Sequence, residues 1–402
     1  MNANIASLYK IAQKSSRIIV GLMSGTSMDG LDVALCKISD SGENTKVELL
    51  QFDTLVFSNE VKTEIQKVFA KPNIDFQTLV LLNEWIGNLH ADMVLECLKK
   101  WNISTDQVDL VASHGQTVFH APKISHQLEK YPNGTLQIGD GDHIAVKTGI
   151  ITLSDFRQKH LAAGGEGAPL AVYGDYLIFG KKGENRIMLN IGGISNFTYL
   201  PENGNPEEVF VTDTGAGNTL IDAFIRLHFP YKSYDKDAEI AKQGTVNQSL
   251  LKALKTNKFF KDPYPKTTGP ELFNIEYVRK AQKESDTETI SVPDLLATLT
   301  RFSAETIADA ILYTINTTQY DRNTFTVYLS GGGTHNPLLI SWLKELLACN
   351  FLTTDAIGIS GDAKEAVLFA VLANETVAGG KTNFGSHQGI PSVSLGKISF
   401  PS

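Results

Sequence analysis

The chain has 402 residues, of which 42% are hydrophobic and 20% are charged, and its formal net charge is −8. This length predicts two or three domains, and the acidic balance argues against broad binding to nucleic acid or to anionic membranes. The three cysteines lie far apart, which is typical of a reducing compartment and gives no zinc signal. No signal peptide and no run of about 20 apolar residues is evident, so we expect a cytoplasmic protein.

Strand and helix signals alternate along the first part of the chain, which indicates an α/β protein. We expect strands over 18–23, 31–38, 47–57, 108–112 and 150–153, a helix over 75–100, and loops over most of 121–150. A glycine loop at 164–169 follows.

A second unit starts near Arg186 and repeats the beginning of the chain faintly. Both 18–38 and 187–200 read as strand, glycine turn, strand. Further strands are expected over 209–212 and 326–329, with helices after residue 218 and over 291–316 and 362–376. This internal repeat is the main clue to the organisation of the chain, because it suggests two similar halves.

Three glycine turns follow apolar strands, at 24–30, 192–196 and 331–333. Glycine lets the backbone approach a ligand closely, and free N–H groups in such a turn can bind a phosphate. Together the three turns suggest a nucleotide held between two halves. The segment 266–269, Lys-Thr-Thr-Gly, also has anion-binding residue types, although solvated turns look the same.

The first turn carries more polar side chains than a hairpin needs. Ser24, Thr26 and Ser27 add hydroxyl donors. Asp29 and Asp32 are carboxylates suited to Mg²⁺ or its waters. Taken alone, the turn is explained equally well as a tight hairpin, since Asp-Gly is a common turn pair.

Asp213 is the residue best suited to catalysis. It ends an expected strand and precedes a helix, where catalytic groups commonly project into a crevice. A carboxylate there can take a proton from an attacking hydroxyl or water. Capping of the helix is the alternative, although a cap does not need both Gly215 and Gly217.

Other polar residues have both a structural and a functional interpretation. Glu365 has the spacing of a capping box with Asp362, which is the interpretation that the residues alone favour. His114 is either a structural histidine or a base or substrate contact. Asp155 and Arg157 either form an exposed ion pair or line a pocket, where an arginine would suit a carboxylate or phosphate.

Taken in order, the motifs resemble those of the anhydro-N-acetylmuramic acid kinase family. The matching segments are GLMSGTSMDGLD (21–32), SHGQT (113–117), SDFR (154–157), GGEGAPL (164–170), LNIGGISN (189–196), DTGAGN (213–218), KTTGPELFN (266–274) and SGGGTHNPLL (330–339). They span nearly the whole chain.

The resemblance implies an α/β fold of the actin, hexokinase and Hsp70 superfamily, with two ribonuclease-H-like domains and ATP in the interdomain cleft. On this basis we expect a first domain over 1–150, completed by 362–402. A second domain is expected over 151–361, with an insert at about 229–290.

The resemblance also assigns roles to single residues, with Asp213 as general base and Glu365 as an acid near the sugar. The residues expected to bind ATP are Gly25, Thr26, Ser27, Met28, Asp29, Gly30, Leu31, Asp32, Asn190, Gly192, Gly193, Asn196, Gly331, Gly332, Gly333 and Asn336. The residues expected to contact the sugar are His114, Gln116, Asp155, Arg157, Gly215, Gly217 and Asn218. Asp29 is expected to hold Mg²⁺ through water.

The implied reaction is unusual for a kinase. Asp213 deprotonates a water that opens the 1,6-bridge of 1,6-anhydro-N-acetylmuramic acid, and the freed O6 takes the γ-phosphoryl of ATP. Three positions depart from the family pattern, since Ala216, Pro270 and Glu166 stand where Pro, Arg and Gln are expected. The loss of an arginine at 270 removes a contact suited to a phosphate or carboxylate.

Two alternatives differ from this reaction. A sugar kinase of the same superfamily would use Asp213 to deprotonate an ordinary hexose hydroxyl. A nucleotide-driven chaperone or filament protein would hydrolyse ATP without phosphorylating a sugar, but no separate substrate-binding domain follows the second unit. The expected partners are an amino sugar and ATP, with no nucleic acid or membrane; a homodimer is left open.

Overall fold

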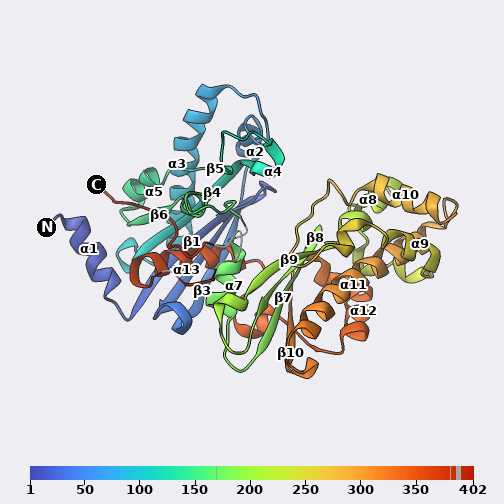
Figure 1. Cartoon of the computed structure of the whole chain (residues 1–402). Coiled ribbons are helices and arrows are strands. Elements are labelled where there is room, and N and C mark those ends of the chain that lie inside the picture. The colour runs from blue at the N-terminus through green and yellow to red at the C-terminus, as the bar shows by residue number, and fades with distance from the viewer. Residues whose placement is uncertain (169, 381, 386–390) are drawn as a thin grey trace. The chain divides into compact units, whose positions relative to one another are not determined.

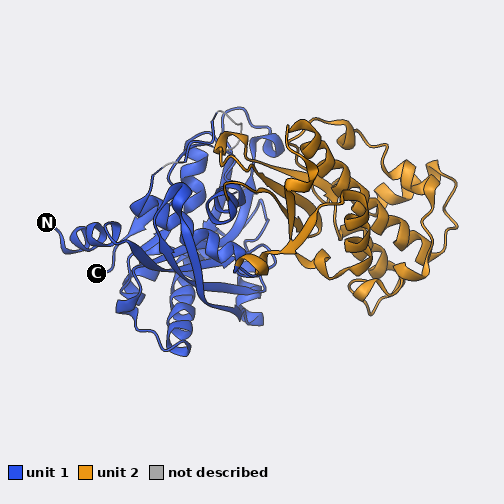
Figure 2. Cartoon of the chain, turned by 90° about the horizontal axis from the view of Figure 1, so that it is seen from below, with its two compact units in different colours: residues 1–180, 358–402 blue, residues 181–357 orange. Residues whose placement is uncertain are grey.

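The computed structural model describes residues 1–168, 170–380, 382–385 and 391–402. The chain divides into unit 1, residues 1–180 and 358–402, and unit 2, residues 181–357 (Figure 2). Each unit is built on its own sheet (Figure 1). No helix of the described residues is long and apolar enough to cross a membrane.

Unit 1 carries a seven-stranded sheet within the described residues, in the order β12-β6-β4-β1-β2-β3, with β5 paired to β4. Its strands are β1 (Ser16–Ser24), β2 (Gly30–Ser39), β3 (Lys46–Val56), β4 (Leu110–Ala121), β5 (Gly134–Ile138), β6 (Thr152–Ser154) and β12 (Lys397–Ser399). Its helices are α1 (Ala3–Ala12), α2 (Asn59–Gln66), α3 (Phe76–Lys100), α4 (Lys123–His126), α5 (Gly141–Thr148), α6 (Phe156–Ala162), α7 (Ala171–Phe179) and α13 (Lys364–Ala378).

Unit 2 carries a five-stranded sheet within the described residues, in the order β11-β10-β7-β8-β9. Its strands are β7 (Asn185–Ile191), β8 (Ile194–Leu200), β9 (Phe210–Ala216), β10 (Phe325–Ser330) and β11 (Asn350–Thr353). Its helices are α8 (Thr219–His228), α9 (Gln248–Leu254), α10 (Ile275–Glu284), α11 (Val292–Thr317) and α12 (Pro337–Leu347).

The two sheets share one topology. In each unit the first three strands are antiparallel neighbours, and two later strands, β4 and β6 or β10 and β11, run parallel to the first. This is the ribonuclease-H-like arrangement. The repeat of strand, turn and strand in the sequence therefore reflects two copies of the same strand order.

Apolar periodicity explains how the helices cover the sheets. In α3, which confirms the helix predicted over 75–100, Leu82, Ile86, Met93 and Cys97 recur at helical spacing and pack in the core with residues of β1 and β2. Asp75 is the N-cap of this helix, and its carboxylate accepts a hydrogen bond from Thr78 N. Helices α11 and α12 cover the sheet of unit 2 in the same way, through the apolar cluster that includes β7 and β10.

The unit boundary lies near residue 180 rather than residue 150. Strand β6 continues the sheet of unit 1 through parallel pairing with β4. Helix α7 is tied to α13 by an ion pair between Asp175 and Lys364, with 2.7 Å between their charged atoms. The expected loops at 121–150 are also wrong over part of their length, because β5 and α5 form there, with Asp140 capping α5.

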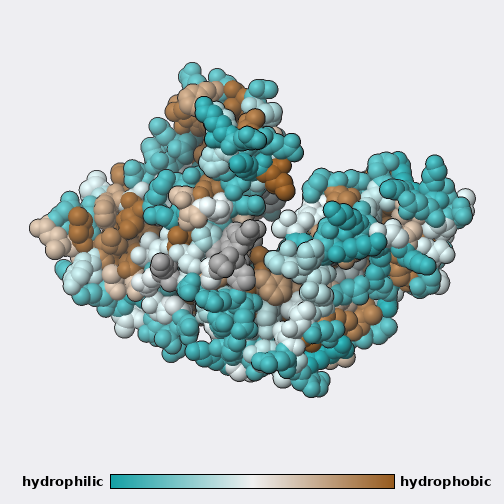
Figure 3. Space-filling model, in the orientation of Figure 1, coloured by the Kyte–Doolittle hydropathy of each residue, from teal (hydrophilic) through white to brown (hydrophobic). Residues whose placement is uncertain are grey.

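A groove of about 360 Å³ lies on unit 1 between the segment before α3 and the β4–β5 pair. Its lining is mostly apolar and includes Val68, Leu79, Phe119 and Leu136, together with Lys71. Figure 3 shows hydrophobic residues among hydrophilic ones over this part of unit 1. None of the predicted site residues lines this groove, so it is separate from the candidate site within unit 1.

Candidate functional site

The first glycine turn, residues 25–29, joins β1 to β2 and presents polar side chains to solvent. Thr26, Ser27 and Asp29 are exposed, and Ser27 Oγ donates to Asp29 Oδ1 at 2.7 Å. A Cβ added at Gly25 would meet nothing nearer than Ser27 Oγ at 3.7 Å, so the backbone is open to a ligand there. At Gly30 a Cβ would lie 2.4 Å from the Leu55 carbonyl oxygen, so this glycine serves strand packing instead.

The β2 residues that follow the turn are less exposed to solvent than the turn residues themselves. The Leu31 side chain lies in the core, so only its backbone faces the turn. Asp32 accepts a hydrogen bond from Thr54 Oγ1 at 2.6 Å, and burial raises the pKa of its carboxyl group. Met28 has a φ of 55°, which lies in the left-handed region and fixes the shape of the turn.

Gln116 supports this turn from β4. Its Nε2 donates to Gly25 O and Thr117 O, both at 3.0 Å, and its Oε1 accepts from Ser24 Oγ at 2.6 Å. The side chain is fully buried. We expected Gln116 to contact the sugar. In the structure its amide group donates to two backbone carbonyls of the protein, and its side-chain oxygen accepts from Ser24.

His114 holds Arg157. Arg157 Nε donates to His114 Nε2 at 2.8 Å, so Nε2 must be the acceptor and the ring proton is assigned to Nδ1, 2.9 Å from Gly115 O. Burial, with the nearby Arg157 charge, lowers the pKa of His114 to about 3. Both ring nitrogens are engaged and the ring is neutral, so His114 orients the guanidinium rather than acting as a base.

Glu365 lies in the first turn of α13, near Arg157. The expected capping box with Asp362 is wrong, because Ala363 is the N-cap and no side chain caps the helix. Desolvation raises the pKa of Glu365, the charges of Lys364 and Arg157 lower it, and Asp32 and Asp175 add to the rise. By solvent accessibility Glu365 is an exposed acid, and Lys364 is its basic neighbour.

Asp155 is engaged elsewhere. It forms an ion pair with Lys397 of β12, and its φ of 55° lies in the left-handed region. The expected ion pair between Asp155 and Arg157 is not formed among the described residues, because Asp155 pairs with Lys397 and Arg157 donates to His114 instead. The glycine loop that follows fixes Arg157 further, since Nη1 donates to Gly167 O at 2.7 Å; Pro169 of that loop lies outside the described residues.

The second glycine turn packs against the DTGAGN segment of unit 2. Gly217 N donates to Gly193 O at 2.8 Å, and Asn218 N donates to Gly192 O at 2.9 Å. A Cβ at Gly217 would lie 2.4 Å from Gly192 O, and one at Gly193 would lie 2.8 Å from Thr219 Oγ1. These glycines are therefore required by the close approach of two turns.

Asp213 lies inside β9 and is not a helix cap. The N-cap of α8 is Asn218, so the capping alternative is wrong. Asp213 Oδ2 accepts a hydrogen bond from Thr268 N at 2.8 Å, and Asp213 pairs with Asn196 of β8 across the sheet. Burial raises the pKa of Asp213 to about 6, opposed by the Thr268 N–H and aided by the charge of Glu271. A carboxylate poised near neutral pH is suited to act as a general base.

The third glycine turn has one open position. A Cβ at Gly331 would lie 2.6 Å from Asn190 Oδ1, and one at Gly333 would lie 2.2 Å from Ile191 Cγ2. At Gly332 it would meet nothing within 4 Å. Asn336 caps α12, with its Oδ1 accepting from Leu339 N at 3.0 Å, so its side-chain oxygen is already used.

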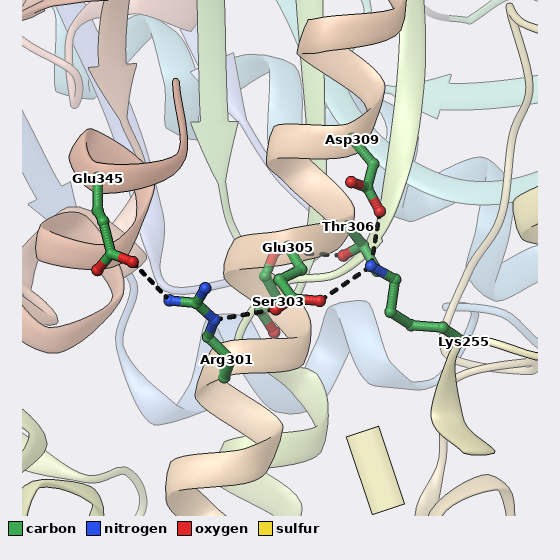
Figure 4. Close-up of polar contacts among 7 residues, drawn as sticks. All are labelled: Lys255, Arg301, Ser303, Glu305, Thr306, Asp309 and Glu345. Atoms are coloured by element: carbon green, nitrogen blue, oxygen red, sulfur yellow. Dashed lines mark hydrogen bonds and ion pairs between the residues drawn. The ribbon is translucent and has the colours of Figure 1, made fainter. Parts of the chain in front are cut away.

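Helix α11 contacts the DTGAGN segment (213–218) through a buried hydrogen bond. Ser303 Oγ donates to Gly217 O at 2.8 Å. On its other side, Glu305 joins Arg301 and Lys255, at 3.0 and 2.9 Å (Figure 4). Lys255 also pairs with Asp309 at 2.7 Å.

Sequence reasoning missed the supporting roles of Ser303 and Thr268. Thr268 lies in the KTTG segment, for which an anion site and a solvated turn were both left open. Its contact with Asp213 could not be read from the sequence. Unit 1 thus gathers the first turn with Gln116 and the Arg157–Glu365 region, and unit 2 gathers Asp213 with the other two turns.

Comparisons with known proteins agree over the whole chain. The model of the family "Anhydro-N-acetylmuramic acid kinase" matches residues 17–401. A protein of that name from Pseudoalteromonas atlantica is 53% identical, over 100% of both chains. Another from Caldanaerobacter subterraneus subsp. tengcongensis is 38% identical, over 98% of this chain and 99% of the relative.

Solved structures are more distant. A hexokinase from Schistosoma mansoni complexed with glucose has a TM-score of 0.35 and 11% identity, over 90% of this chain and 86% of that one. The fold assignment therefore rests on the strand order of the two sheets. On the full-length match to its family and relatives, the chain belongs to the anhydro-N-acetylmuramic acid kinase family.

Proposed function

We propose that this protein is an ATP-dependent kinase that opens 1,6-anhydro-N-acetylmuramic acid with water and phosphorylates O6. The products are N-acetylmuramate 6-phosphate and ADP, and the reaction belongs to murein recycling in the cytoplasm. The observation that carries the proposal is Asp213, a half-buried carboxylate whose pKa is raised to about 6, in a chain that matches this family over residues 17–401. Its protonation state is suited to removing a proton near neutral pH.

In the proposed reaction, the Asp213 carboxylate takes a proton from water as the water oxygen attacks the anomeric carbon. The bond from that carbon to O6 breaks, and O6 takes the γ-phosphoryl group while ADP leaves. The anhydro sugar has no free hydroxyl at O6, so ring opening must generate the nucleophile. Phosphoryl transfer itself is mostly positioning and charge stabilisation.

The remaining residues bind and orient. Backbone N–H groups of the turns at 25–29 and 192–193, with the open Gly332, are proposed to contact ATP. Arg157, held by His114, is proposed to bind the substrate's carboxylate, for which a guanidinium is well suited. Glu365 is proposed to orient the sugar or the attacking water.

Mg²⁺ is proposed to accompany ATP, and the residues of the first turn fit it only as outer partners. No group of three or more His, Cys, Asp or Glu side chains among the described residues could hold a metal ion by itself. Mg²⁺ usually keeps several waters and binds substrate phosphates with one or two carboxylates. Asp29, exposed in the turn, would hold it through water, and the ion would neutralise phosphate charge.

The test is product analysis with the purified full chain. With anhydro-N-acetylmuramic acid and Mg-ATP, we expect one ADP per sugar and a product heavier by one water and one phosphoryl group. Glucose and N-acetylglucosamine are the controls for an ordinary hexose kinase. Phosphorylation of those sugars alone would contradict the proposal.

A further inference from the structure

The side chain of Lys266 is buried within unit 2, although its motif suggested an anion ligand. Its Nζ donates to Phe259 O at 2.7 Å and to Asp262 O at 3.3 Å. It also lies 4.5 Å from the ring centroid of Phe259 and 4.2 Å from that of Tyr264. The residue is 9% exposed, so its ammonium group is directed into the protein's own carbonyls and rings.

The backbone of the same lysine joins its segment to β9. Asp213 N donates to Lys266 O at 2.9 Å. Lys266 N donates to Thr212 Oγ1 at 3.0 Å, and that hydroxyl donates back to Lys266 O at 3.2 Å. Lys266 is thus fixed at its side chain and at its backbone, directly beside the proposed base.

Two residues further on, the same segment reaches the carboxylate of Asp213. Thr268 N donates to Oδ2 at 2.8 Å. Within the described part of the chain, Asp213 Oδ1 has no hydrogen-bond partner. One oxygen is therefore held by the backbone, and the other is left for a substrate proton.

We infer that Lys266 is a positioning residue that anchors the 259–268 segment, so that the Thr268 N–H fixes Asp213 and Oδ1 takes the proton. The inference rests on the proposed function, in which Asp213 is the base. It differs from both alternatives that the sequence left open for the KTTG segment, an anion site and a solvated turn. A shift of about 1 Å in a catalytic group can lower the rate by about 100-fold, so a distant anchor can matter.

The sign of the expected pH effect follows from the hydrogen bond. The Thr268 N–H stabilises the Asp213 carboxylate and lowers its pKa, whereas burial and the charge of Glu271 raise it. If the segment loosens, the carboxylate loses this donor and its pKa rises. Because the base must be deprotonated, the acidic limb of the kcat profile then moves to higher pH.

The test compares Lys266→Met with Lys261→Met, an exposed lysine of the same segment. Methionine keeps an apolar stem against the two rings but removes the ammonium group. We expect Lys266→Met to lower kcat by about 10- to 100-fold. We also expect the acidic limb to rise by about half a pH unit or more, with KM for ATP and sugar changed less than about threefold. Lys261→Met should match wild type.

The inference would be overturned if Lys266→Met raised the KM for ATP or for the sugar tenfold or more and left the acidic limb of the kcat–pH profile unshifted. That result would identify Lys266 as an anion ligand. If Lys266→Met does not fold, Lys266→Arg decides the question. A lysine that binds phosphate can be replaced by arginine, whereas a site fitted to an ammonium group cannot accommodate the larger guanidinium. We therefore expect Lys266→Arg to lower kcat and to move the acidic limb of the kcat–pH profile to higher pH. An inactive wild type would overturn the proposed function, whereas an active wild type with unshifted variants would overturn only this inference.

Discussion

Units 1 and 2 share a strand order but use their first hairpin turns differently. In unit 1 the turn at 25–29 presents Thr26, Ser27 and Asp29 to solvent and is held from below by Gln116. In unit 2 the turn carbonyls at 192 and 193 accept hydrogen bonds from the segment before α8. With the same topology, the first turn therefore exposes polar side chains in unit 1, whereas in unit 2 its backbone is held by hydrogen bonds.

The candidate acidic residues of the two units also differ in the contacts that hold them. Glu365 of unit 1 lies at a helix start among charged side chains, with Lys364 and Arg157 opposing the effect of burial on its pKa. Asp213 of unit 2 lies in a strand and is fixed by a backbone N–H. A backbone contact holds one geometry, so we expect the more demanding chemical role for Asp213.

The largest expected effect is that of Asp213→Asn. Asparagine keeps the size of the side chain but cannot take a proton, so turnover should fall by about 1,000-fold or more. Binding of ATP, measured by calorimetry, should stay within about threefold of wild type. Turnover close to wild type would remove Asp213 from the proposed role.

A pair of glycines separates packing from ligand access in the third turn. Gly333→Ala places a Cβ 2.2 Å from Ile191 Cγ2 and should lower the free energy of unfolding by about 1–3 kcal/mol. Gly332→Ala meets nothing within 4 Å and should leave stability unchanged while raising KM for ATP. Equal losses of stability, measured by urea unfolding, would contradict this distinction.

Glu365→Gln should lower turnover by about 10-fold, less than the Asp213 variant, because orientation rather than proton removal is lost. No side chain caps α13 at this end, so the melting temperature should change little. A changed melting temperature with normal turnover would show that Glu365 is structural.

His90 gives unit 1 a predicted acid sensitivity. Its ring is fully buried, neither nitrogen has a hydrogen-bond partner within the described residues, and burial lowers its pKa to about 4. Unfolding below the ordinary histidine pKa takes up a proton, so stability is lost as the pH falls from about 6.5 towards 4.

His90→Leu removes that titration and should add about 1–2 kcal/mol to the free energy of unfolding at pH 5. The gain should be smaller at pH 8, where the histidine is neutral in both states. Urea unfolding at the two pH values measures the difference. An equal change at both values would exclude protonation of His90 as the cause.

Most of the fold could be predicted because its signals are local. The apolar periodicity of 75–100 and the repeated hairpins mark α3 and both sheets directly. The short elements β5 and α5 were missed, because a few residues carry little periodicity. The boundary near residue 180 depends on the pairing of β6 with β4, which is a contact between segments far apart in sequence.

The candidate site was predictable in residue type but less so in role. Asp213 stood out through the glycines that follow it. Gln116 and Lys266 carry the same polar groups as ligand contacts, but in the structure these groups hydrogen-bond to Gly25 and Phe259. Roles of this kind depend on where a side chain points, which sequence spacing does not determine.

The most direct test of the proposed reaction is a turnover in ¹⁸O-labelled water with anhydro-N-acetylmuramic acid and Mg-ATP. If water attacks the anomeric carbon, the newly formed sugar phosphate carries the label at C1 and none in its phosphate group. Analysis at early times separates this label from slower exchange at the free anomeric carbon. A phosphorylated product without label at C1 would contradict the hydrolytic opening of the ring by a water activated by Asp213.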